Sequence, residues 1–271
     1  MMKFAICNET FKHWQREDIF RYCARIGYDA VEVAPFTLAT YVTDISSAER
    51  AHIRTLASNA GIEISGIHWV LVQTEGMHLT SPDAPTRART AQYLCDLADF
   101  CADIGGRAII VGSPKQRALC SGVTYEEGWD WANEVFRPAI KRAEERGVVI
   151  CLEPLPAEDT NFINTAAEAV RFVKPFASSA FKVILDVRAM CHEDKPVPQI
   201  IRESRGYFAY VHANDENLKG PGFGRVDYAP IASALREVAY NGMISVEVFR
   251  YDEGPEAIAS KSLDYLKRMF G

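Results

Sequence analysis

Four short apolar segments in the second half of the chain carry an acidic residue or a histidine at or near their last position. They are VVICLE with Glu153, KVILD with Asp186, YFAYVH with His212 and MISVEV with Glu247. Two Glu, one Asp and one His form an oxygen-rich set that suits Mn²⁺, Mg²⁺ or Co²⁺. Because unpaired buried charge is costly, this set favours a single divalent metal site over four separate salt bridges.

These segments belong to a pattern that runs along the whole chain, in which a helical stretch ends at glycine and a short apolar run follows. Gly27 precedes YDAVEV, Gly61 precedes IEISGI and Gly147 precedes VVICLE. Glycine suits the position after a helix, since it adopts the left-handed conformation without a Cβ penalty. Nearly continuous apolar runs are typical of parallel strands covered by helices. With KFAIC at 3–7 and FKVILD at 181–186, the pattern predicts eight strands.

Helix-length patterns alternate with these runs, and several begin with a capping box. The boxes pair Ser46 with Glu49, Thr124 with Glu127, and Thr165 with Glu168. Eightfold alternation in 271 residues predicts an α/β fold, a (β/α)8 TIM barrel forming one domain over residues 1–271. A doubly wound open sheet is the alternative, but the sequence lacks the glycine-rich phosphate loop that it would lead us to expect. In a barrel, residues at the carboxyl ends of the strands build the active site.

Composition limits the partners. The chain is 48% hydrophobic, and its 36 acidic residues outnumber its 30 basic ones, for a net charge of −6. This balance argues against gripping a nucleic-acid backbone, and no apolar run approaches the about 20 residues that span a bilayer. The seven cysteines contain no Cys-x-x-Cys and are interpreted as reduced core residues. We therefore expect a cytoplasmic protein with no membrane or nucleic-acid partner.

Several motifs resemble one known group of proteins. They are LEPLPAEDTNFINT at 152–165, ILDVRAM at 184–190, VHANDENLKGPGFGRVDY at 211–228 and SVEVF at 245–249. The chain resembles the sugar isomerase/epimerase superfamily of xylose-isomerase-like barrels over essentially its whole length. The resemblance implies that Glu153, Asp186, His212 and Glu247 bind one divalent metal. In the ketose 3-epimerase branch it also implies that the two Glu form the acid/base pair.

That chemistry would act on a small sugar or a polyol-derived ketone. A metal chelated by a carbonyl and its neighbouring hydroxyl is a Lewis acid that stabilises an enediolate, while Glu153 and Glu247 move protons. Return of the proton to the opposite face gives epimerisation, and return to the adjacent carbon gives aldose–ketose isomerisation. The alternative is a lyase on the same scaffold that dehydrates an inosose or 3-dehydroshikimate. Related barrels often dimerise or tetramerise, so the resemblance leaves a homo-oligomer open.

Two positions depart from the ketohexose 3-epimerases. Ala189 stands where they carry a histidine, and Leu218 stands where they carry an arginine, followed here by Lys219. The Pro-Gly-x-Gly stretch is closer to the hydroxypyruvate isomerase and inosose dehydratase branches. The substrate therefore stays open among keto sugars, other polyols and acid sugars.

Four further residues are candidates for binding the substrate. His68 and Trp69 end the predicted third strand, and an imidazole donor beside an aromatic ring is a common carbohydrate-binding arrangement; a packed core histidine is the alternative. Glu158 and Asn161 lie in the loop after the predicted fifth strand, where related enzymes hold hydroxyl-binding side chains. Helix capping is the alternative for both.

Cations near the predicted strand ends are candidates for binding a phosphate or carboxylate. Lys115 and Arg117 lie in one loop after the predicted fourth strand, with a solvated turn as the alternative interpretation. Arg188 and Arg250 follow two of the candidate metal ligands and could serve the same purpose. Glu32, in the second strand, is expected either to face the barrel mouth or to pair with a base such as Lys115.

Overall fold

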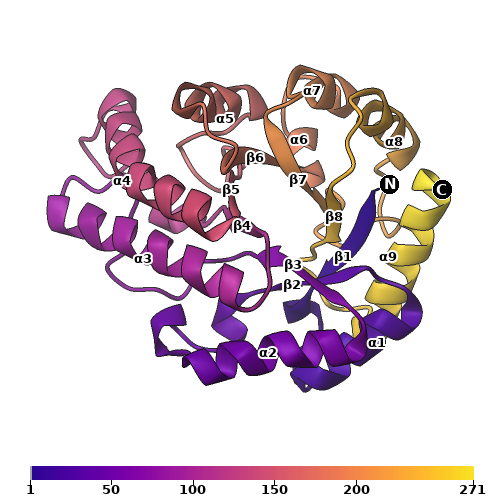
Figure 1. Cartoon of the computed structure of the whole chain (residues 1–271). Helices are drawn as coiled ribbons and strands as arrows, with labels where there is room; N and C mark the ends of the chain where they lie inside the picture. The colour runs from indigo at the N-terminus through magenta and orange to yellow at the C-terminus, as the bar shows by residue number, and fades with distance from the viewer. Residues whose placement is uncertain (1) are drawn as a thin grey trace.

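A computed structural model describes residues 2–271. Eight parallel strands form a closed barrel at its centre (Figure 1). Each strand pairs with the next in the sequence, and β8 closes the barrel by pairing with β1. The strands are β1 (Lys3–Cys7), β2 (Ala30–Val33), β3 (Glu63–Ile67), β4 (Ala108–Val111), β5 (Val149–Leu152), β6 (Phe181–Asp186), β7 (Phe208–Ala213) and β8 (Met243–Val246). The predicted (β/α)8 barrel is confirmed.

Helices surround the barrel, and the last of them brings the chain's end back to β1 (Figure 1). Over residues 2–271 the α-helices are α1 (Arg16–Ile26), α2 (Ser47–Ala60), α3 (Ala84–Asp103), α4 (Tyr125–Arg146), α5 (Ala166–Val173), α6 (Val187–Cys191), α7 (Val197–Glu203), α8 (Tyr228–Glu237) and α9 (Pro255–Phe270). Short 3₁₀ turns are η1 (Asn8–Thr10), η2 (Pro35–Thr37), η3 (Val42–Asp44), η4 (Pro114–Gln116) and η5 (Lys174–Phe176). In this range no helix combines the length and apolar character needed to cross a bilayer.

Of the three glycines and three capping boxes that the sequence predicts, all but one box form as expected. Gly27, Gly61 and Gly147 take the left-handed conformation directly after α1, α2 and α4. The capping boxes at the starts of α4 and α5 are complete. At the start of α2, Ser46 accepts the backbone N–H of Glu49, but the Glu49 carboxylate pairs with Arg16 at 2.6 Å. This box is therefore only half formed, because an ion pair competes for its acid.

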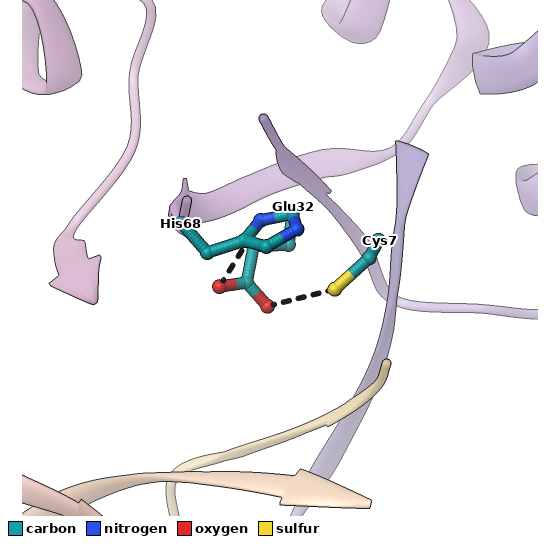
Figure 2. A group of neighbouring side chains, drawn as sticks. All are labelled: Cys7, Glu32 and His68. Atoms are coloured by element: carbon teal, nitrogen blue, oxygen red, sulfur yellow. Dashed lines mark hydrogen bonds and ion pairs between the residues drawn. The ribbon is translucent and has the colours of Figure 1, made fainter. Parts of the chain in front are cut away.

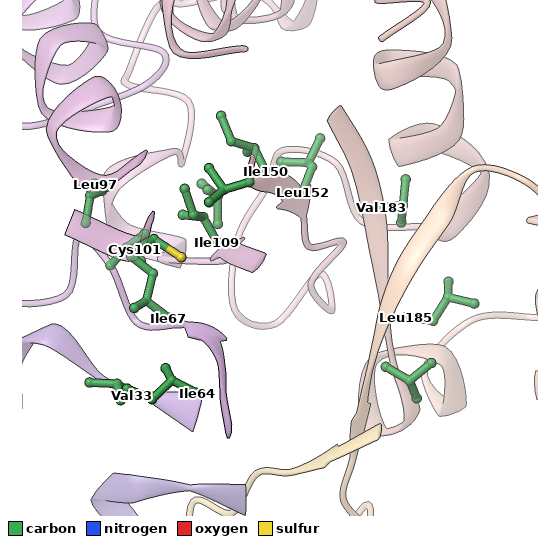
Figure 3. Packing of buried hydrophobic residues seen from close by; sticks show 14 of the residues in the cluster. Val33, Ile64, Ile67, Leu97, Cys101, Ile109, Ile150, Leu152, Val183 and Leu185 are labelled. Atoms are coloured by element: carbon green, nitrogen blue, oxygen red, sulfur yellow. The ribbon is translucent and has the colours of Figure 1, made fainter. Parts of the chain in front are cut away.

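The pleat of the strands separates two apolar layers. Outward-facing residues such as Ile67 and Ile109 pack against the helices, and Figure 3 shows Leu97 and Cys101 of α3 close to them. Inward-facing residues, among them Cys151 and Ile184, form a smaller cluster inside the barrel. Side chains alternate between the two faces of a strand, so residues two positions further along also point inward.

This alternation positions the four candidate metal ligands. Glu153 follows the inward-facing Cys151 by two residues and Asp186 follows Ile184 by two. His212 stands in the same relation to the inward-facing Tyr210. The candidate metal ligands therefore lie at the carboxyl end of the barrel, directly above the inner cluster that contains Cys151, Ile184 and Tyr210.

Candidate active site

Glu153, Asp186, His212 and Glu247 converge inside the barrel. Each offers one ligand atom, and these four atoms all lie within 4.8 Å of one another. The four residues come from the ends of β5 to β8 and are at most 8% exposed. The strand-end pattern in the sequence therefore corresponds to one compact group of side chains.

The electrostatics of this group suit a cation. Burial raises the pKa of Asp186 to about 7, and repulsion by Glu153 and Glu247 adds to the rise. Burial and the Glu247 charge also raise the pKa of Glu153. His212 Nδ1 lies 3.1 Å from Glu247 Oε2, yet neither atom has an aligned hydrogen-bond partner in the described part of the chain. Buried polar atoms without partners, next to mutually repelling carboxylates, are what a site for a divalent cation requires.

A cavity of about 440 Å³ opens over this group. Glu153 and Glu247 face it together with His68 and Trp69. Its remaining walls are Val72, Ile110, Gly112, Ser113, Pro114, Lys115, Gln116, Leu155, Asp159, Arg188, Leu218 and Phe249. A mostly apolar wall with a few polar groups at its base is typical of a small-molecule site.

His68 and Trp69 both reach the site, but with partners that the sequence did not predict. His68 is fully buried between two carboxylates, with Nε2 3.0 Å from Glu9 Oε2 and Nδ1 3.6 Å from Glu32 Oε1. Although burial lowers the pKa of His68, these two acids outweigh it and raise the pKa to about 9. The indole Nε1–H of Trp69 donates to Glu247 Oε1 at 2.8 Å. The backbone of Trp69 has a φ of 55°. A bulky residue with positive φ is uncommon and carries backbone strain.

The two cations of the η4 loop have different environments. Lys115 is exposed on the cavity rim. Arg117 is fully buried and donates to the backbone carbonyls of Glu153 and Ile163. Burial lowers the pKa of Arg117 to about 10. The alternative of a solvated turn is therefore wrong for Arg117, and its guanidinium is occupied by the backbone.

Of the other predicted cations and loop residues, Arg188 lines the cavity, and Glu158, Asn161 and Arg250 do not. Arg188 lines the cavity, where it pairs with Glu158 at 2.6 Å and with Asp159 at 2.9 Å. Asn161 Oδ1 accepts the backbone N–H of Leu119 at 2.7 Å and so ties two loops together. Arg250 pairs with Asp252 at 3.0 Å on the surface. Glu158, Asn161 and Arg250 are therefore not placed to contact a substrate in this cavity as the structure describes it.

Sequence reasoning missed two supporting residues, Glu9 and Gly112, and did not predict the partners of a third, Glu32. Glu9 lies on η1 directly after β1 and is only 6% exposed. Glu32 pairs with His68 and His212, and not with Lys115 as one alternative held. A Cβ atom at Gly112, after β4, would collide with the Glu153 carboxylate, so a glycine there makes room for the cluster. Each assignment depends on which strands become neighbours, for which a single sequence gives no local signal.

The barrel and its strand-end acids define a class of protein. Residues 20–269 match the family described as xylose isomerase-like TIM barrel, and the chain belongs to this family. D-psicose 3-epimerase from Ruminiclostridium cellulolyticum is 30% identical over 247 residues, which cover 88% of this chain and 82% of that protein. The enzyme of the same name from Agrobacterium fabrum is 27% identical, with 88% of this chain and 83% of the relative covered.

Other similarities extend over the whole length. The 3-dehydro-D-guloside 4-epimerase of Escherichia coli is 22% identical, covering 98% of this chain and 99% of that protein. The crystal structure of D-psicose 3-epimerase with D-tagatose from Clostridium cellulolyticum H10 superposes with a TM-score of 0.88 at 24% identity, covering 99% of both chains. This protein is accordingly an enzyme of the isomerase class, and these relatives give no support to the dehydratase alternative.

Proposed function

We propose that this protein is a divalent-metal-dependent sugar epimerase that inverts a carbon next to the carbonyl of a small keto sugar. The observation that carries the proposal is the convergence of Glu153, Asp186, His212 and Glu247 within 4.8 Å at the base of a cavity. The names of the relatives, which are epimerases of psicose, ribulose and a dehydroguloside, support the same class of substrate.

The four clustered residues would hold one Mn²⁺, Mg²⁺ or Co²⁺ ion. When bound, the ion would supply a Lewis acid that polarises the sugar carbonyl and acidifies the neighbouring C–H. The protein already holds the ligands in place. Asn214 donates its side-chain N–H to Asp186 Oδ2, and the backbone N–H of Ala189 donates to Asp186 Oδ1 at 2.7 Å.

Glu153 and Glu247 would move the protons. Both carboxylates line the cavity, and they project from different strands, β5 and β8. A sugar lying between them could lose its α-proton to one carboxylate and receive a proton on its other face from the second. The Trp69 indole holds Glu247 Oε1, which leaves Oε2 directed at the cluster. Trp69 and Phe249, with rings 6.0 Å apart, would exclude water from the reacting carbon.

The charges around the cavity favour an uncharged sugar. Arg188 is neutralised by Glu158 and Asp159. Lys219 is held by Glu253 at 2.6 Å, and its neighbour Leu218 lines the cavity in its place. Lys115 on the rim is the cavity-lining cation that has no ion-pair partner among residues 2–271. One exposed lysine is a weak site for a phosphate or carboxylate, so we favour keto sugars over sugar phosphates and acid sugars.

The test is a screen of D-psicose, L-ribulose and 3-dehydro-glycosides with metal-reconstituted protein in deuterated water, followed by proton NMR. We expect deuterium at the inverted carbon of both epimers, and loss of turnover in E153Q and E247Q. E237Q is the matched control, because this carboxylate is exposed at the end of α8 and pairs with Arg202 away from the cavity. Full turnover by E153Q and E247Q with metal bound would contradict the proposal. An ultraviolet band from a conjugated enone would instead identify a lyase.

A further inference from the structure

Glu32 is a carboxylate buried inside the barrel that the proposed chemistry does not use. It projects from β2 and is 0% exposed. Its ion-pair partners within the described chain are two imidazoles, those of His68 and His212. A buried carboxylate is costly unless it is hydrogen-bonded, so its place here calls for a specific role.

The two ring nitrogens of His212 face different surroundings. Nε2 lies 3.2 Å from both Glu32 oxygens. Nδ1 points the other way, 3.1 Å from Glu247 Oε2 and 3.7 Å from Glu153 Oε1. A neutral imidazole carries one proton, and here only Nε2 has aligned acceptors, the two Glu32 oxygens, whereas Nδ1 has no aligned hydrogen-bond partner in the described part of the chain. The lone pair on Nδ1 is then left facing the carboxylate cluster.

We propose that Glu32 is a positioning residue that fixes the Nε2–H tautomer and the ring orientation of His212, so that Nδ1 is preorganised as a metal ligand. The inference rests on the proposed function, since it concerns the same four-residue cluster. A carboxylate that accepts the second N–H of a ligating histidine raises the basicity of the ligand and prevents the ring from turning.

Glu32 is itself held from several strands. Tyr210 on β7 donates its hydroxyl to Glu32 Oε2 at 3.0 Å and also contacts Ser65 Oγ at 2.8 Å. Cys7 on β1 donates its thiol to Oε2 at 3.6 Å, and His68 Nδ1 lies 3.6 Å from Oε1; Figure 2 shows both contacts. With hydrogen bonds from Tyr210 and Cys7 and an ion pair with His68, the carboxylate has little freedom to move away from His212.

The trio of Cys7, Glu32 and His68 also has the composition of a metal site. The hydrogen bonds favour an anchor instead. Burial raises the pKa of the Cys7 thiol well above its usual range, so it stays a donor to Glu32 and not a thiolate ligand. If the trio bound a metal, each chain would bind two ions; if Glu32 only positions His212, each chain would bind one.

The experiment measures Mn²⁺ binding to the metal-free full-length protein by isothermal titration calorimetry. We expect one ion per wild-type chain, and a Kd about 10- to 100-fold higher in E32Q, which keeps the side chain's size but removes its charge. C7A is the matched control, because it removes the hydrogen bond from Cys7 to Glu32 and leaves the contact between Glu32 and His212 intact. Its Kd should stay within about twofold of wild type.

A second measurement needs no variant at Glu32. Nitrogen-15 NMR of histidine-labelled wild type loaded with Mg²⁺ should report a proton on Nε2 of His212, with the signal assigned by its loss in H212Q. A proton on Nδ1, an E32Q Kd equal to wild type, or two ions per chain would each overturn the inference. If wild type epimerises a sugar while E32Q binds Mn²⁺ normally, only this inference fails. If wild type binds no divalent cation, the proposed function fails with it.

Discussion

Arg117 is a buried guanidinium that joins β4's loop to the loop after β5, and its removal should destabilise the fold. It is 0% exposed and donates to the carbonyls of Glu153 and Ile163. Lys115, two residues earlier, is exposed on the cavity rim. The two cations belong to one loop, but only Arg117 supports the backbone of a candidate catalytic residue, Glu153. Lys115 therefore serves as its control.

The magnitude follows from the contacts. R117M keeps the apolar stem and removes two charge-assisted hydrogen bonds, each worth about 1.5–3 kcal/mol. Part of this loss is offset, because burying a guanidinium costs desolvation energy, and a net loss of about 2–4 kcal/mol remains. At about 2–4 °C per kcal/mol, the Tm should fall by roughly 4–16 °C. K115M should change stability by no more than about 0.5 kcal/mol, as exposed substitutions usually do.

Differential scanning calorimetry of the metal-free variants checks this prediction. Metal-free protein is used so that altered metal binding does not enter the Tm. The reasoning is refuted if R117M and K115M melt within about 2 °C of each other, a separation smaller than the two lost hydrogen bonds should produce. It also fails if R117K restores the wild-type Tm, because a lysine ammonium cannot reproduce the fork that reaches both carbonyls.

Three further predictions concern the cavity wall. W69F removes the donor to Glu247 and should lower kcat/KM about 10- to 100-fold with little change in Tm, as steady-state kinetics and melting can verify. G112A should displace the Glu153 carboxylate and weaken Mn²⁺ binding at least about tenfold in a folded protein, which calorimetry and circular dichroism would report. His68, with its pKa raised to about 9 by two carboxylates, stabilises the fold fully below about pH 6.5, and this contribution is lost as pH rises through 9. Metal-free wild type should therefore lose more stability than H68Q over this range, and parallel urea-denaturation profiles would count against it.

Most of the fold could be predicted because its signals are local. Gly27 and Gly147 end helices through a backbone conformation that glycine adopts without strain, and the apolar runs that follow form strands. The extra helix α6 was not predicted. It has five residues, Val187–Cys191, too few to display a helical period, and it begins at Asp186, whose side chain caps it. One residue thus serves as a strand end, a helix cap and a candidate metal ligand.

The site could be predicted only in part. Strand alternation brought Glu153, Asp186, His212 and Glu247 to one level, as the pattern of strand-end acids indicated. Their partners depend on which strands meet when the barrel closes. The indole of Trp69 and the carboxylate of Glu247 are 178 positions apart in the sequence, yet they share a hydrogen bond. No spacing rule connects such residues.

The two halves of the barrel carry different parts of the site. The candidate ligands come from the ends of β5 to β8, and two side chains that orient them, Glu32 and Trp69, come from β2 and from the segment after β3. A ligand set built by half of a barrel needs the other half to orient it, since a carboxylate or imidazole can present either of two atoms to a cation. Glu32 selects the nitrogen of His212 and Trp69 selects the oxygen of Glu247. Substitutions at Glu32 and Trp69 should therefore change metal affinity and turnover before they change the fold, whereas substitutions of the apolar residues inside the barrel, such as Cys151 and Ile184, should do the reverse.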